Sequence, residues 1–368
     1  MLRTPGPTTC PPEVLAAMSK QMTGFSDELA EAITASRDGI KNILESPFSE
    51  VYVALLAASG TGAMEAAVSS FLSPGDRVNV YSCGTFGDRF AEIALAFGLN
   101  VQLCSRPPGY GFRPDEFTKD FARSRKIFGE PKAVFITHNE TSTGVTNPVC
   151  ELAKIVRENS GALVIVDAIS SFAITPLKMN AWNIDVVVGG VQKGLMTPPG
   201  LSFVAFNEYA KQAYERSTMP HFYFDLGKYI SPTAKVQMPF TPAIPQIMAL
   251  KEAIGLIHKE GTAVYERHKR LAAYFRKMVN VLGLEILAKE YFSDGVTAIK
   301  VPDGLKADDI IRVMKEDFGI IIAGGPGELA GKIIRIGHMG YFASEDISNT
   351  FYALERTLIK LRNVEKLL

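Results

Sequence analysis

The sequence lacks an excess of charge of either sign. Its 368 residues include 39 Lys and Arg and 39 Asp and Glu, so the formal net charge is zero. Proteins that bind nucleic acids or membrane surfaces rely on excess positive charge, so we expect neither as a partner. The sequence also lacks a hydrophobic run long enough to span a membrane, and its proline-rich opening segment lacks the apolar stretch of a signal peptide.

Cysteine is scarce, and the four cysteines are Cys10, Cys83, Cys104 and Cys150. No two of them form a C-x-x-C pair, and no histidine stands at metal-ligand spacing from them. This scatter indicates reduced thiols and favours neither a disulfide framework nor a metal site. We therefore expect a cytoplasmic protein without a bound metal.

The sequence does contain a series of short apolar segments that alternate with helical patterns. The chain is too long for one ordinary domain, and its length suits two. The predicted strands of the first part span residues 51–59, 77–82, 100–105, 132–138, 162–168, 184–190 and 201–206. Because these strands are almost wholly apolar, we expect an α/β protein with a mostly parallel central sheet that is buried on both faces.

The pattern divides the chain into three parts. Prolines keep the opening segment out of a helix, so residues 1–20 are predicted to form an N-terminal arm. Residues 21–250 are predicted to form a large domain, and residues 251–368 a smaller C-terminal α/β domain. A long helical pattern over residues 245–261 leads from the large domain to the small one.

Two charged residues stand at the ends of apolar strands, where ligands bind in open parallel sheets. Asp167 ends the apolar run ALVIVDA, and Lys193 is the one charged residue after the opening aspartate of DVVVGGVQKGLMTPPG. Burying an unpaired ammonium group costs several kcal/mol, so a chemical reason is needed for its position. The two residues stand 26 positions apart, which accommodates one helix and one strand and should bring both side chains to the same edge.

Two further clusters follow predicted strands. Ser59, Gly60 and Thr61 form a turn in front of a helix, which is either a phosphate site or a plain glycine turn. A dinucleotide site would place an acidic residue at the end of the next strand, which instead ends VYSCG, so nicotinamide binding is rejected. The segment THNETSTG supplies small hydrogen-bonding side chains after another strand.

One cofactor accounts for these residues together. A lysine in a dry pocket loses its proton more easily and becomes a nucleophile toward an aldehyde, which pyridoxal 5'-phosphate supplies. The phosphate of this cofactor suits the turn at Gly60, and its ring nitrogen needs a carboxylate such as Asp167. An aromatic side chain should cover the ring, and Phe86 follows the strand over residues 77–82.

The order and spacing of several motifs carry a family resemblance over nearly the whole chain. These motifs are TPGPT, ASGTGAMEA, PGDRV, THNETSTG, VDAISS, VQKGLMTPPG, PFTP and GKIIRIGHMG. In them the sequence resembles the class V aminotransferases of the alanine/serine–glyoxylate group, which have fold type I of the pyridoxal-phosphate enzymes. Two departures stand out: many relatives carry a His-Arg pair where this chain reads MTGFSDELA, and some carry tyrosine at the position of Met238.

The resemblance implies roles for the residues that act on the substrate and the cofactor ring. Lys193 would bind the cofactor covalently and move the substrate proton, and Asp167 would pair with the ring nitrogen. Phe86 would stack on the ring, where some members carry tryptophan. Ser142 would lie near the ring hydroxyl and the substrate, and Arg335 would bind the substrate carboxylate with its planar fork.

The resemblance also implies how the cofactor phosphate is held. The residues at the phosphate end would be Ser59, Gly60, Thr61 and Gln192. Thr241, in PFTP, would reach the phosphate of a second subunit, so the expected assembly is a homodimer with shared active sites.

The predicted activity is a ping-pong transfer of the amino group of alanine or serine to glyoxylate or pyruvate. Arg335 supplies one fork for the α-carboxylate, and the recognised motifs supply no second cation. An aspartate-using enzyme stays open, because Arg3 of the arm could add that charge. A lyase or desulfurase on the same fold is a further alternative, although desulfurases usually carry histidine where this chain has Gln192. The last alternative is a non-catalytic binding protein on the same fold, which would be expected to lack Lys193 or Asp167. His338 is equally compatible with packing and with function.

Overall fold

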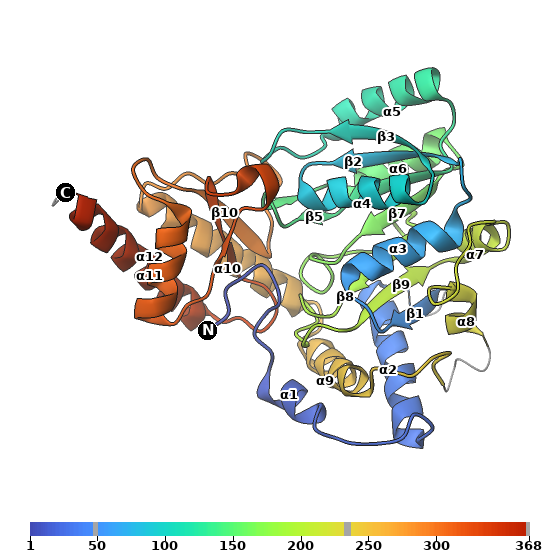
Figure 1. Ribbon diagram of the computed structural model, residues 1–368, viewed down its shortest axis with the longest axis horizontal. Helices are drawn as coiled ribbons and strands as arrows, with labels where there is room; N and C mark the ends of the chain where they lie inside the picture. Colours follow the sequence, from blue (N-terminus) through green and yellow to red (C-terminus); the bar gives the residue numbers. More distant parts are fainter. Residues whose placement is uncertain (47–50, 232–236, 366–368) are drawn as a thin grey trace.

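A seven-stranded sheet forms the centre of the larger part of the molecule. The fold is that of a computed structural model, which describes residues 1–46, 51–231 and 237–365. The strand order is β1-β9-β8-β7-β4-β2-β3 (Figure 1). The strands are β1 (Tyr52–Leu56), β2 (Arg77–Ser82), β3 (Asn100–Ser105), β4 (Ala133–Thr137), β7 (Leu163–Asp167), β8 (Val186–Gly190) and β9 (Ser202–Phe206).

Six of the seven strands run in one direction, so their carboxyl ends lie along the same side of the sheet. β9 pairs antiparallel with both of its neighbours, β1 and β8. The pairs from β8 through β7, β4 and β2 to β3 are all parallel. β1 therefore runs in the same direction as the other five, and the prediction of a mostly parallel α/β sheet is confirmed.

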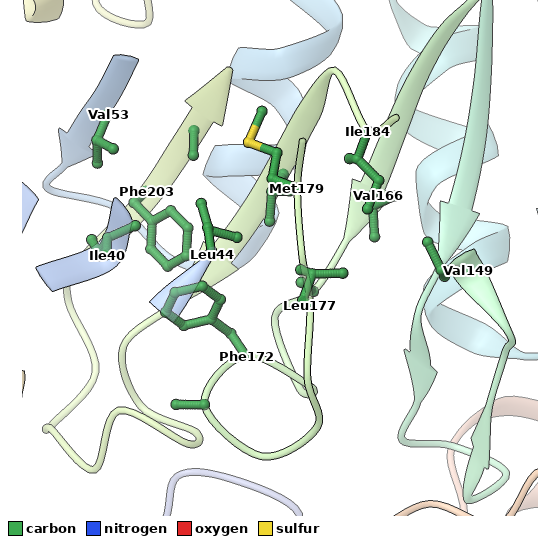
Figure 2. Close-up of a cluster of buried hydrophobic side chains, with 14 of the residues drawn as sticks. Ile40, Leu44, Val53, Val149, Val166, Phe172, Leu177, Met179, Ile184 and Phe203 are labelled. Atoms are coloured by element: carbon green, nitrogen blue, oxygen red, sulfur yellow. The ribbon is translucent and has the colours of Figure 1, made fainter. Parts of the chain in front are cut away.

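Helices cover both faces of the sheet because successive strand residues point to opposite sides. Val166 of β7 belongs to the core on the side of α2, and Ile165 to the core on the side of α3. Figure 2 shows part of the first core, where Ile40 and Leu44 lie beside Phe203 of β9. The helices on this side are α2 (Asp27–Ile43), α5 (Pro114–Phe128) and α6 (Val149–Asn159). Those on the other side are α3 (Gly60–Phe71), α4 (Thr85–Ala96), α7 (Glu208–Tyr214) and α8 (Leu226–Ile230).

The C-terminal part is a smaller α/β unit, as predicted. Its antiparallel sheet has the order β10-β12-β11, with β10 (Val296–Lys300), β11 (Ala323–Gly324) and β12 (Ile333–Gly337). Its helices are α10 (Ala263–Val281), α11 (Ala307–Phe318) and α12 (Ser344–Glu365). The long helix α9 (Ile244–Glu260) packs on α2 and runs unbroken through the boundary predicted at residues 250 and 251.

The N-terminal arm lies between the two parts. It stays non-helical up to Pro11, and a short helix, α1 (Pro12–Ala17), then begins at a proline, a residue that suits the first helical position. The Arg3 N–H donates to the Ile321 carbonyl at 2.8 Å, and the Gly337 N–H donates to the Arg3 carbonyl at 2.7 Å. Thr8 in turn donates its N–H to the Gln192 carbonyl at 3.1 Å. The arm thus joins the small unit to the edge of the large sheet.

Candidate active site

A cavity of about 120 Å³ opens at the edge of the large sheet where the parallel strands end. It brings together most of the predicted site residues. Its lining consists of Ser59, Gly60, Thr61, Met64, Phe86, Arg89, Asn139, Thr141, Asp167, Ile169, Ser170, Gln192 and Lys193. Of the ten residues predicted for the site, Ser142, Thr241 and Arg335 are not in this lining.

Lys193 lies in the turn after β8 and is only 9% exposed. Its Nζ donates a hydrogen bond to the carbonyl of Pro5 in the N-terminal arm. Burial, together with the nearby positive charge of Arg335, lowers the pKa of Lys193 to about 8. A lysine with this pKa is partly neutral near pH 8, and the neutral amine is the form that attacks an aldehyde or accepts a proton.

Asp167 is the last residue of β7, beside β8 in the sheet. Its Oδ1 accepts the Ile169 N–H at 2.8 Å. Burial raises the pKa of Asp167 to about 7, since a buried carboxylate loses its hydration. A cationic ring nitrogen in the cavity would supply the partner that the charged form needs.

The turn from Ser59 to Thr61 begins α3 at the same edge. The Ser59 side chain makes no capping hydrogen bond to the first N–H groups of α3. Among the described residues, the buried Oε1 of Gln192 also has no hydrogen-bond partner. Gly60 is close-packed, because a Cβ there would lie 2.6 Å from Ile169 Cδ1. These features suit a phosphate group, for which a helix N-terminus is a ready site.

Phe86 enters the cavity from the first turn of α4, together with a cation that sequence reasoning missed. The guanidinium carbon of Arg89 lies 4.9 Å from the centre of the Phe86 ring. Its Nη1 donates to Thr61 Oγ1 at 3.4 Å. Arg89 therefore joins the Phe86 ring to the turn from Ser59 to Thr61. The spacing of Phe86 and Arg89 could have indicated this, because residues three apart on a helix lie on the same face.

The loop after β4 presents Thr141, rather than Ser142, to the cavity. Ser142 is fully buried, and its hydroxyl donates to Glu140 Oε1 at 2.6 Å. The same hydroxyl oxygen accepts the Thr85 N–H at 3.1 Å. These hydrogen bonds hold the hydroxyl between Glu140 and the start of α4. The residues of the segment after β4 that line the cavity are Asn139 and Thr141.

Arg335 on β12 reaches the loop after β4 from the small unit. Its Nε donates to the Gly324 carbonyl at 2.8 Å, and its Nη1 donates to the Thr141 carbonyl at 3.2 Å. Burial lowers its pKa, and the negative charge of Glu140 opposes that change. The guanidinium stays charged and lies beside a residue of the cavity wall, as a substrate carboxylate would require.

Three other residues considered in the sequence lie elsewhere. Thr241 is exposed and does not line the cavity of its own chain. His338 is buried in the small unit, where its Nε2 contacts Thr297 Oγ1 at 2.9 Å and burial lowers its pKa to about 3. Arg3 is buried in the arm and pairs with Asp346.

The cavity residues fit pyridoxal 5'-phosphate. A lysine of lowered pKa, a buried carboxylate, a half-buried aromatic ring and an uncapped helix start all border one space. Lys193 would hold the cofactor covalently, Asp167 its ring nitrogen and Phe86 its ring face. In the described parts of the chain, no three His, Cys, Asp or Glu side chains are grouped to hold a metal ion, and no helix is long and apolar enough to cross a membrane.

Comparison with known proteins gives one family. The family model for class V aminotransferases matches residues 1–349. The chain is 40% identical to the small subunit of a soluble hydrogenase from Synechococcus sp., over 98% of this chain and 93% of that protein. It is 33% identical to L-aspartate–glyoxylate aminotransferase from Paracoccus denitrificans, over 91% and 85%. The crystal structure of alanine–glyoxylate aminotransferase from Nostoc sp. superposes with a TM-score of 0.89 at 30% identity, over 97% and 94%.

Proposed function

Because the chain belongs to the class V aminotransferase family, it is an aminotransferase that depends on pyridoxal phosphate, and we propose that alanine or serine is its amino donor. Glyoxylate or pyruvate would be the acceptor. The observation that carries the proposal is the meeting of Lys193 and Asp167 in one cavity, beside a loop that Arg335 reaches.

The lysine would do most of the chemistry that the protein contributes. The cofactor supplies an electron sink that makes the α-proton of an amino acid acidic. Lys193 Nζ would accept that proton, and its lowered pKa keeps part of it neutral for the task. Asp167 would hold the proton on the ring nitrogen that keeps the electron sink effective.

The charges at the substrate end favour a small neutral donor. Arg335 would bind the α-carboxylate through two parallel hydrogen bonds. The cavity lining contains one other cation besides Lys193, and that cation, Arg89, bonds to Thr61 at the phosphate end. Arg3 is held by Asp346. The described site therefore offers no free cation for a carboxylate in the donor side chain.

The relatives agree on the acceptor more than on the donor. Two aminotransferases similar to this chain are named for glyoxylate, one with aspartate and one with alanine. Glyoxylate is therefore the acceptor that we favour. Aspartate as donor is the second candidate, since the relative named for it is 33% identical over 91% of this chain.

The deciding experiment measures kcat/KM for alanine, serine and aspartate with glyoxylate as the fixed acceptor. We expect alanine or serine to exceed aspartate by at least about tenfold, the effect of one missing charge pair. A preference for aspartate would refute the donor assignment and leave the aminotransferase standing. Hydrogen uptake with a viologen dye, measured on the same preparation, tests the activity for which the Synechococcus relative is named, and we expect none above background.

A homodimer with shared active sites is part of the proposal. Thr241 is exposed and follows the half-buried Phe240, whose ring lies 5.0 Å from the ring of the exposed Tyr223. Phe222, beside Tyr223 in the chain, is 73% exposed. An apolar surface of this kind favours burial against another protein chain. Thr241 would then reach the phosphate site of the second copy. The four cysteines, all free thiols, support a cytoplasmic location.

A further inference from the structure

Glu140 is a buried carboxylate that the site residues named so far do not include. It lies in the short strand β5 (Asn139–Glu140) and has no exposed surface. Each of its oxygens accepts two hydrogen bonds. Oε1 accepts the Ser142 N–H at 3.0 Å and the Ser142 hydroxyl at 2.6 Å. Oε2 accepts the N–H groups of Phe86 at 3.0 Å and Gly87 at 3.1 Å.

These four hydrogen bonds connect two separate walls of the cofactor cavity. One oxygen holds the first turn of α4, which carries the Phe86 ring. The other holds the loop that carries Thr141. Packing leaves little room for the two walls to shift, because a Cβ on Gly84 would lie 2.7 Å from Glu140 Cγ and 2.3 Å from Ser142 Oγ.

The charge of Glu140 also suits its surroundings. Burial raises its pKa, and its four hydrogen bonds favour the ionised form. Its negative charge acts on two buried cations of the site, Lys193 and Arg335, and raises the pKa of each. A charged carboxylate at this place therefore stabilises the positive charge of Arg335 and limits how far burial lowers the pKa of Lys193.

We propose that Glu140 is a positioning residue of the cofactor site, which fixes Phe86 and Thr141 at the spacing that the cofactor ring requires. This inference rests on the proposed use of pyridoxal phosphate. Only a carboxylate meets the requirement, because both of its oxygens accept. Glutamine has the same shape, but its amide nitrogen donates and would face either two N–H groups or the Ser142 N–H and hydroxyl.

The test compares Glu140→Gln with Asp185→Asn, a matched buried carboxylate. Asp185 also accepts a backbone hydrogen bond, from Val164 at 2.8 Å, but it precedes β8 at the opposite edge of the sheet. For each variant we would measure the dissociation constant of pyridoxal phosphate, the visible circular dichroism per bound cofactor and the melting temperature of the apoprotein. We expect Glu140→Gln to bind the cofactor at least about tenfold more weakly and with altered dichroism. Asp185→Asn should lower only the melting temperature.

A double-mutant cycle shows whether Glu140 acts through the ring of Phe86. In a Phe86→Leu background, the effect of Glu140→Gln on cofactor affinity should fall to less than about threefold, because coupled residues are not additive. If Glu140→Gln does not fold, Ser142→Ala removes one of the four donors and should weaken cofactor binding in the same direction. Unchanged affinity and dichroism in the variant that folds, or an equal loss in both backgrounds, would overturn the proposal. A wild-type protein that binds no cofactor would overturn the proposed function as well.

Discussion

Replacing Asp167 with asparagine should stabilise the apoprotein and weaken the holoenzyme. Burial raises the pKa of Asp167 from its ordinary value of 3.8 to about 7. This difference is about three powers of ten in proton affinity, which corresponds to about 4 kcal/mol of folding free energy. Asparagine has the same shape, keeps an oxygen for the Ile169 N–H and carries no charge to desolvate.

The direction of the pH effect follows from the proton count. Between pH 4 and pH 7 the folded apoprotein keeps a proton on Asp167 that the unfolded chain has lost. The free energy of unfolding of the wild-type apoprotein therefore falls as the pH rises through this range, and it levels off above about pH 7. In Asp167→Asn this loss is absent, so the variant should exceed the wild type by up to about 4 kcal/mol at pH 8 and match it near pH 4.

Adding the cofactor should make the wild type the more stable of the two proteins. In the proposed site, a protonated ring nitrogen would pair with the carboxylate of the wild type but not with a neutral amide, so the variant should gain less stability from the cofactor and turn over more slowly. Urea denaturation of both proteins at pH 5 and pH 8, with and without pyridoxal phosphate, measures the free energy of unfolding, its pH dependence and the stabilisation by the cofactor. Equal stability of the two apoproteins at pH 8 would refute the reasoning about burial. A normal turnover rate in Asp167→Asn would refute the pairing with the ring nitrogen.

Three other substitutions test the remaining parts of the site. Lys193→Ala should lower kcat by roughly three orders of magnitude or more, and borohydride labelling of the wild-type holoenzyme should modify Lys193 and not another lysine. Arg335→Lys should raise KM for every amino donor by about tenfold, since an ammonium group cannot form the paired hydrogen bonds; an unchanged KM would contradict this. Gly6→Ala should reduce cofactor binding more than Gly75→Ala. Both glycines have positive φ, but a Cβ on Gly6 would lie 2.4 Å from Lys193 Cδ and one on Gly75 meets nothing within 4 Å. Equal losses would mean that backbone strain alone is responsible.

The sequence predicts the sheet well because its strands are short and most of them are apolar and buried, with β3 at the edge as the half-exposed exception. The run ALVIVDA, for example, becomes β7 with every residue buried. The direction of β9 could not be read in the same way. Its residues are all buried too, so an antiparallel strand inside the sheet has the same composition as a parallel one. The helices α5 and α12 were not predicted, although both are long.

The site was predictable to the extent that strand ends mark it. Asp167 and Lys193 follow neighbouring strands, and the sheet brings them together as expected. The choice between Thr141 and Ser142 depends on which way a tight loop turns each side chain, and both are small hydroxyl residues. Glu140 shows the same limit, because a glutamate in a polar loop gives no sign that it will be buried with four donors around it.

The N-terminal arm connects the architecture to the choice of substrate. Arg3 pairs with Asp346, its guanidinium carbon lies 4.6 Å from the centre of the Phe342 ring, and its backbone bonds to Ile321 and Gly337. Swinging the Arg3 side chain into the cavity would break its contacts with Asp346 and Phe342 and leave the half-buried Asp346 without its cation. The arm therefore gives Lys193 a hydrogen-bond acceptor, the Pro5 carbonyl, while the charge of Arg3 stays paired with Asp346. A second carboxylate on the donor would therefore find no free cation on the arm, which supports the proposed preference for alanine or serine over aspartate.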